Sequence, residues 1–136
     1  TRFWVTIEQG VDFVLQCFGN MTGGEIFVPK IPSMRIKDLI DVLAPVYAIN
    51  VTGIRPGEKL HEQMIGLEDS YTTFEYKDYF KILPQLNSWG VDKKRIKLGK
   101  KVKEGFIYSS DNNKDWMTKA YFRNWIKANY EFIGKI

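Results

Sequence analysis

The chain has 136 residues, 44% of them hydrophobic and 26% charged, which is enough to build the core of one domain and excludes a disordered chain. Its one cysteine, Cys17, rules out a disulfide framework and indicates a reducing compartment, and we expect a buried thiol on a helix rather than a nucleophile. With no apolar run of about 20 residues and no signal-peptide pattern, the prediction is a cytoplasmic protein without a membrane partner.

Residues 7–19 are predicted to form an amphipathic helix. Thr6 and Gln9 have the spacing of a capping box at its start, and Gly19-Asn20 ends it. Its apolar residues recur at helical spacing: Ile7, Val11, Val14, Leu15 and Phe18. Residues 1–5 favour a β conformation and begin abruptly, which indicates a chain cut from something larger.

The next two elements are a strand at residues 25–29 and a helix at residues 34–44. The strand is a short apolar run typical of burial on both faces. Ser33 is the expected N-cap of the helix, and Pro45 forces its end. Helix, strand and helix in this order indicate an α/β fold.

Residues 49–54 have the β-branched composition of a short strand that stops at a sharp corner. Pro56 supplies a fixed φ and Gly57 the positive φ of a type II turn. A short helix is expected to follow at residues 59–65. The turn therefore holds two opposite charges, Arg55 and Glu58, beside one rigid corner.

These two charges allow two interpretations. A guanidinium at a corner offers a planar fork for a phosphate or diphosphate, and a nearby carboxylate can accept hydrogen bonds from sugar hydroxyls. Alternatively, Arg55 and Glu58 pair with each other at the surface, a contact worth about 0–1 kcal/mol. Residue types do not decide between them.

The remaining elements are strands at residues 71–76, 80–83 and 106–108 and a final helix at 119–130, capped by Thr118. Residues 85–104 carry seven Lys or Arg against two acidic residues. This segment therefore accounts for the net charge of the whole chain, which is +4. A basic segment can follow a polyanion, but a Lys-rich stretch with no regular period is more often a long solvated loop. Nucleic acid therefore remains only an alternative partner.

Several kinds of chemistry are missing from the sequence. His61-Glu62 lacks the second histidine of a zinc motif, because residue 65 is Ile, so no metal site is expected. Gly23-Gly24 precedes a strand, whereas a dinucleotide-binding loop must follow one, so we place no cofactor site here. We also find neither a Tyr-x-x-x-Lys pair nor paired carboxylates, and so no catalytic residue. The residues thus indicate a binding domain with an anion-accepting corner.

Four stretches together resemble one family: residues 1–11, 23–34, 53–62 and 108–113. They are similar to the C-terminal portion of inverting UDP-N-acetylglucosamine 4,6-dehydratases, extended short-chain dehydrogenase/reductase proteins related to bacterial enzymes of capsule and flagellin-glycan biosynthesis. The stretches follow the family's order, so together they are more specific than a single glycine motif. Residues 85–104 and the tail beyond Trp116 do not match, and we assign no role to Ser109–Asn113.

The resemblance implies that residues 1–136 are one substrate-binding region, which includes an edge strand and a helix of the Rossmann domain. NADP and the catalytic residues would lie upstream of Thr1, so this chain is expected to be inactive alone, and the parent enzyme to be a homo-oligomer. The Arg-Pro-Gly-Glu string implies that Arg55 and Glu58 contact the UDP-sugar, and Arg2 is a weaker candidate. The alternatives are a sugar-nucleotide epimerase of the same superfamily and a non-enzymatic polyanion-binding module.

Overall fold

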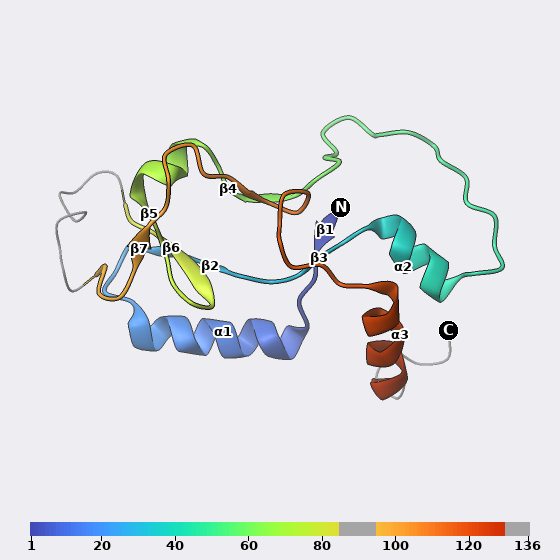
Figure 1. Ribbon diagram of the computed structural model, residues 1–136, viewed down its shortest axis with the longest axis horizontal. Coiled ribbons are helices and arrows are strands. Elements are labelled where there is room, and N and C mark those ends of the chain that lie inside the picture. Colours follow the sequence, from blue (N-terminus) through green and yellow to red (C-terminus); the bar gives the residue numbers. More distant parts are fainter. Residues whose placement is uncertain (85–94, 130–136) are drawn as a thin grey trace. The chain divides into compact units, whose positions relative to one another are not determined.

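The computed structural model describes residues 1–84 and 95–129 (Figure 1). Helices and strands are interspersed along the chain, so the predicted α/β character is confirmed. The elements are β1 (Arg2–Phe3), α1 (Ile7–Asn20), β2 (Ile26–Pro29), β3 (Ser33–Met34), α2 (Ile36–Leu43), β4 (Gln63–Ile65), the 3-10 helix η1 (Glu68–Thr72), β5 (Thr73–Glu75), β6 (Tyr79–Ile82), β7 (Lys100–Lys101), β8 (Tyr108–Ser109) and α3 (Lys119–Ala128). No helix among these described residues is long and apolar enough to cross a membrane.

Contacts divide the chain into two compact units, each assembled from segments that are distant in sequence. Unit 1 consists of Thr1–Trp4, Pro32–Glu62 and Ser110–Ile136, and unit 2 of Val5–Ile31 and Gln63–Ser109. The chain therefore passes between the two units four times. The corner that carries Arg55 belongs to unit 1.

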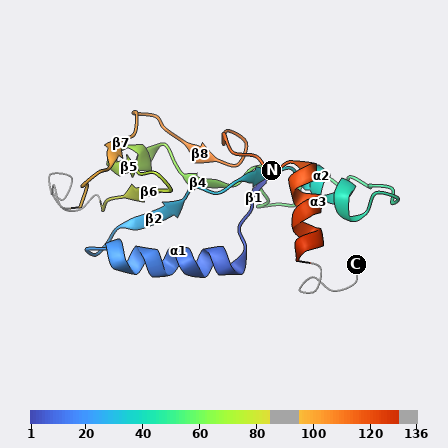
Figure 2. The same ribbon diagram turned by 60° about the horizontal axis from the view of Figure 1, so that its bottom comes forward.

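Unit 2 is built on an antiparallel sheet with the strand order β2-β6-β5-β7. Helix α1 runs beside this sheet (Figure 2), and the ring of Phe13 lies 6.3 Å from that of Tyr79 on β6. A separate pair, β4 with β8, is antiparallel and irregular between Gln63 and Ile65. Strand β2 lies at one edge of the four-stranded sheet, and its Ile26 is 60% exposed, so the expected burial on both faces is wrong for this residue.

A charged cluster is buried within unit 2. Arg95 Nη1 donates to Glu25 Oε1 at 2.9 Å and to the Gly23 carbonyl at 2.8 Å, and the Glu25 side chain is 0% exposed. Lys81 Nζ donates to the Arg95 carbonyl and lies over the rings of Phe27 and Tyr76. Burial lowers the pKa of the Lys81 ammonium, whereas the negative charge of Glu25 has a smaller, raising effect on it. Arg95, at the centre of the basic stretch, is thus a core residue.

Unit 1 packs its helices around an aromatic cluster. Phe122 of α3 is 4% exposed, with its ring 5.2 Å from Trp4 in an edge-on arrangement and 6.2 Å from Trp125 in a stacked one. Met34 of β3 and Met117 complete the buried centre. Arg2–Phe3 pairs with Ser33–Met34 as an antiparallel two-stranded ladder. The start of the chain is thereby fixed to the core of unit 1.

The helices predicted at residues 7–19, 34–44 and 119–130 are present as α1, α2 and α3, with one error at a cap. Thr6 and Gln9 form the capping box of α1, and Thr118 accepts a hydrogen bond from the Tyr121 N–H at the start of α3; residue 130, the last of that predicted helix, lies outside the described residues. Ser33 does not cap α2: Arg35 is the N-cap and forms no side-chain cap bond. Ser33 is instead fully buried in β3, where its backbone bridges to Trp116.

Three predictions between residues 44 and 76 are wrong. Residues 49–54 form no strand, because no neighbouring strand pairs with them and they are exposed. Residues 59–65 form no helix: 59–62 are irregular, and Gln63–Ile65 are strand β4, since β8 offers a pairing partner that outweighs local helix preference. The strand expected at 71–76 is shortened to β5, because η1 occupies Glu68–Thr72.

The later strands agree better with expectation. Strand β6 occupies the predicted position at 80–83, shifted by one residue, and β8 (Tyr108–Ser109) overlaps the strand expected at 106–108. Of the basic segment, residues 85–94 lie outside the described residues. The rest is not simply a loop, because Lys100–Lys101 form β7 and pair with β5.

Candidate functional site

The predicted type II turn at Arg55 is confirmed. The Glu58 N–H donates to the Arg55 carbonyl at 3.0 Å, which closes a four-residue turn around Pro56 and Gly57. Gly57 has φ 83°, the left-handed conformation that the third position of a type II turn requires. Any residue with a side chain would be strained at this position. The corner is therefore a rigid feature within an otherwise irregular stretch.

The two charged side chains at this corner do not pair with each other. Glu58 Oε2 accepts a hydrogen bond from the backbone N–H of Arg55 at 3.0 Å, so the carboxylate adds a second link between the two ends of the turn. Within residues 1–84 and 95–129, the guanidinium of Arg55 has no hydrogen bond or ion pair, and the residue is exposed. The surface ion pair considered from the sequence is thus absent here. The fork of Arg55 remains open to an anion, and Glu58 holds the turn that carries it.

Arg2 lies at the point where this exposed stretch returns to the core of unit 1. Its Nη1 donates to the carbonyls of Thr1 at 2.7 Å and Leu60 at 3.2 Å. Its Nε lies 3.3 Å from Glu62 Oε1, with the two side chains 33% and 46% exposed. Strand β1 is thereby tied to residues 60–62. Arg2, predicted from the sequence as a weaker nucleotide contact, therefore also links two segments that are distant in the chain.

Ser110 and Thr1, to which the sequence analysis assigned no role, complete this junction. Ser110, which is fully buried, exchanges hydrogen bonds with Glu62: its N–H donates to the Glu62 carbonyl at 2.8 Å, and its Oγ accepts from the Glu62 N–H at 2.9 Å. Thr1 Oγ1 lies 2.6 Å from Ser110 Oγ and 2.8 Å from His61 Nδ1. No local pattern pairs residues 48 positions apart, so only their shared place in the matching stretches could have indicated them.

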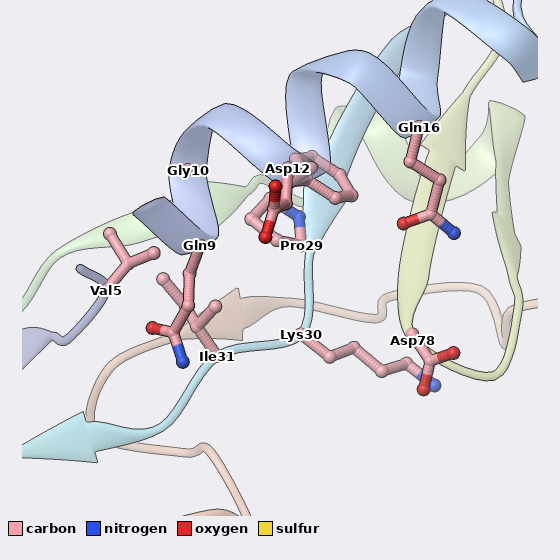
Figure 3. Close-up of a pocket in the computed structure, with 10 residues that line it drawn as sticks. Val5, Gln9, Gly10, Asp12, Gln16, Pro29, Lys30, Ile31 and Asp78 are labelled. Atoms are coloured by element: carbon pink, nitrogen blue, oxygen red, sulfur yellow. The ribbon is translucent and has the colours of Figure 1, made fainter. Parts of the chain in front are cut away.

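A hollow of about 380 Å³ lies in unit 2 between α1 and the segment after β2 (Figure 3). Gln9, Asp12 and Gln16 project from the helix, and the Lys30 side chain extends beside Asp78. The Lys30 ammonium already donates to Glu75 Oε1 at 2.8 Å and to the Tyr76 carbonyl at 2.6 Å. The walls of the hollow therefore present carboxylates and amides but no available cation. Such a surface is a poor environment for a negatively charged diphosphate.

Cys17 is not a candidate nucleophile. It is half-buried on α1, less than the full burial expected, and burial raises the pKa of its thiol, with a smaller opposing effect from Lys81. A raised pKa keeps the sulfur protonated near neutral pH, and the thiol is a poor nucleophile in that form. Of the four places considered, the turn at Arg55 and the junction in unit 1 offer the cationic groups that an anionic ligand needs.

Residues 1–84 match the protein family described as "Polysaccharide biosynthesis protein", and the chain belongs to that family. Within it, the chain is 50% identical over 125 residues to a UDP-N-acetylglucosamine 4,6-dehydratase (inverting) of Campylobacter jejuni. That alignment covers 88% of this chain and 37% of the relative. The resemblance inferred from the four stretches is thereby confirmed.

Two further comparisons support the same superfamily. A UDP-glucose 4-epimerase of Rickettsia rickettsii is 30% identical over 118 residues, covering 84% of this chain and 35% of the relative. A crystal structure of Pen from Bacillus thuringiensis superposes with a TM-score of 0.72 at 27% identity, covering 93% of this chain and 37% of that one. The chain therefore spans little more than a third of the length of the proteins that it matches.

Proposed function

We propose that this chain is the substrate-binding C-terminal part of an NADP-dependent UDP-N-acetylglucosamine 4,6-dehydratase that makes 4-keto-6-deoxy sugar nucleotides for surface glycans. The observation that supports it most directly is the open guanidinium of Arg55 on a rigid turn, in a chain 50% identical to such a dehydratase. A UDP-sugar epimerase is the second candidate, favoured by the 30% identity to the Rickettsia rickettsii protein. Both reactions use a UDP-sugar, so the binding role is common to them.

Each site residue has a distinct part in this proposal. The planar fork of Arg55 binds the diphosphate through two parallel hydrogen bonds. Glu58 holds the turn with Oε2 and accepts from a ribose or sugar hydroxyl with Oε1. Arg2 supplies a second positive charge. All three residues bind and orient the substrate.

The cofactor and the reacting groups belong to residues upstream of Thr1 in this proposal. Gly23 and Gly24 lie before β2 rather than between a strand and a helix, so they do not fit a dinucleotide-binding loop. NADP bound by those upstream residues would supply the hydride-transfer chemistry, and the residues of this chain would only hold the substrate. The parent enzyme is proposed to act in the cytoplasm as a homo-oligomer.

Replacing Arg55 by alanine in the full-length parent is expected to weaken UDP binding by about 1.5–3 kcal/mol, the range for a hydrogen bond to a charged group. Arg55→Lys should restore only part of the affinity, because an ammonium keeps the charge but loses the fork. Glu58→Gln should cost less than Glu58→Ala, since the amide keeps one acceptor oxygen. Calorimetric titration with UDP and UDP-N-acetylglucosamine measures each effect.

The matched control for Arg55 is Lys59→Ala, which removes a neighbouring exposed cation outside the turn. It separates the fork of Arg55 from general positive charge, and it should change UDP affinity by less than a factor of about two. Thermal melts check that each variant is folded. If Arg55→Ala binds UDP as tightly as the parent enzyme, the diphosphate site lies elsewhere.

The exposed face of α1 provides an independent test that the chain is part of a longer protein. Gly10, Phe13 and Cys17 are partly covered, whereas the neighbouring apolar face is exposed: Ile7 87%, Val11 53%, Val14 51%, Leu15 63% and Phe18 66%. A helix apolar over so wide an arc normally packs on two sides. We propose that the upstream cofactor domain covers this face and adds its sheet beside β2.

The isolated chain of 136 residues should consequently bind a hydrophobic dye and self-associate. Val11→Lys with Leu15→Lys should reduce both in the isolated chain but lower the unfolding temperature of the full-length parent, because there the two side chains would be buried. Gln16→Lys, on the polar side of the same helix, should do neither. A monomeric isolated chain that binds no dye would contradict this arrangement.

A further inference from the structure

We propose that Glu62 is a positioning residue that orients the guanidinium of Arg2 toward the diphosphate of the bound UDP-sugar. The inference rests on the proposed function, because it assumes that unit 1 binds a nucleotide-sugar beside Arg55. It assigns to Glu62 a role in affinity without any contact with the ligand.

The contacts of Arg2 leave one edge of its guanidinium for a ligand. Both N–H groups of Nη1 are directed to backbone oxygens, those of Thr1 and Leu60, and Nε faces Glu62. Within the described parts of the chain, Nη2 has no partner. A guanidinium is planar, so fixing Nε and Nη1 also fixes the direction of the Nη2 edge. Two N–H donors are thus oriented in advance of binding.

Glu62 is itself held by the core of unit 1. Its backbone exchanges two hydrogen bonds with the fully buried Ser110, so its carboxylate starts from a fixed position. Leu60, the second acceptor of Arg2, lies five residues beyond Arg55 on the same exposed stretch. The junction therefore couples the Arg2 guanidinium to the end of the segment that carries the turn.

Because Glu62 is negatively charged, the direction in which UDP affinity changes on its neutralisation shows whether it positions Arg2. A carboxylate near a diphosphate repels it, so a Glu62 that did no positioning would weaken UDP binding, and its neutralisation would strengthen binding. If Glu62 instead holds the guanidinium in place, its neutralisation frees the Arg2 side chain, and ordering that chain then opposes binding. The two roles predict opposite changes in affinity.

The experiment is a calorimetric titration of UDP into the full-length parent and four variants: Glu62→Gln, Arg2→Ala, the double variant of these two, and the control Glu8→Gln. Glu62→Gln should weaken UDP binding about threefold, in line with a half-exposed ion pair. Arg2→Ala should weaken it about tenfold, as for a lost bond to a charged group. The double variant should match Arg2→Ala, because Glu62 acts only through Arg2. Glu8→Gln, which removes an exposed charge on α1, should change nothing.

Tighter binding by Glu62→Gln, or additive losses in the double variant, would overturn the inference. Glu62→Asp keeps the charge but shortens the side chain, and it should also weaken binding, which provides a second measurement if the amide variant is unstable. Arg55→Ala separates this inference from the proposed function. If Arg55→Ala loses affinity while Glu62→Gln and Glu62→Asp do not, only the role of Glu62 is wrong; if Arg55→Ala is also without effect, both are wrong.

Discussion

Replacing Phe122 by alanine is expected to lower the free energy of unfolding by about 3–5 kcal/mol, the range for truncating a buried phenylalanine. The Phe122 ring is 4% exposed and contacts Trp4 edge-on and Trp125 face to face, so its loss leaves a cavity and two aromatic contacts unmade. Urea denaturation of the full-length parent, followed by tryptophan fluorescence, measures the change. Trp4 and Trp125 report on the cluster directly.

Phe122→Leu is the matched control, because it keeps most of the apolar volume and should cost roughly 1.5 kcal/mol or less. Tyr121→Ala, at an adjacent position that is 57% exposed, should change stability by about 0.5 kcal/mol at most. UDP affinity should fall with Phe122→Ala only when unit 1 unfolds, since the turn at Arg55 is fixed by its own hydrogen bonds. A loss of stability no larger than that of Tyr121→Ala would show that the cluster does not hold unit 1 together.

Sequence reasoning succeeded where a structure depends on residues close together in the chain. Thr6 and Gln9 form a capping box within four residues, and Pro56-Gly57 determine a turn by their own dihedral preferences. A helix such as α1 also shows its period over several turns. Each of these features needs no knowledge of the distant chain.

The errors occurred where a distant segment decides the outcome. Residues 49–54 have β-branched side chains but no partner strand, whereas Gln63–Ile65 become a strand because β8 lies beside them. Ser33 has the composition of a helix cap, yet pairing with Phe3 and bridging to Trp116 place it in a strand. The free energy of a local conformational preference is smaller than the free energy gained by such strand pairing.

The candidate site also has one part that local sequence predicts and one part that depends on distant segments. Arg55 and Glu58 were found from one string of four residues, and that string also predicted their turn. The junction of Arg2 with Glu62 and Ser110 required the fold, since its members come from three separate segments. The resemblance indicated a UDP-sugar as the substrate class, which composition and spacing alone did not.

Replacing Arg95 by methionine is expected to lower the free energy of unfolding by about 3 kcal/mol, because it leaves the buried carboxylate of Glu25 without its counter-charge. Burial alone would raise the pKa of the Glu25 carboxyl, but hydrogen bonds from backbone N–H groups, that of Gly23 first, and the charge of Arg95 hold it below its ordinary value. The stability that Glu25 contributes is therefore present above the ordinary glutamate pKa of about 4.3 and is lost as pH falls through the lowered folded-state value. Removing Arg95 should shift this loss to higher pH.

Lys97→Met is the matched control, because it removes an exposed cation from the same turn and should cost about 0.5 kcal/mol or less. Adding Glu25→Gln to Arg95→Met should recover part of the lost stability, since the buried amide carries no charge to desolvate and keeps one acceptor for the Gly23 N–H. Urea denaturation at pH 7 and pH 5 measures both effects. Equal stability of Arg95→Met and Lys97→Met would mean that the backbone N–H groups suffice for Glu25, and that Arg95 belongs with the solvated cations of the basic segment.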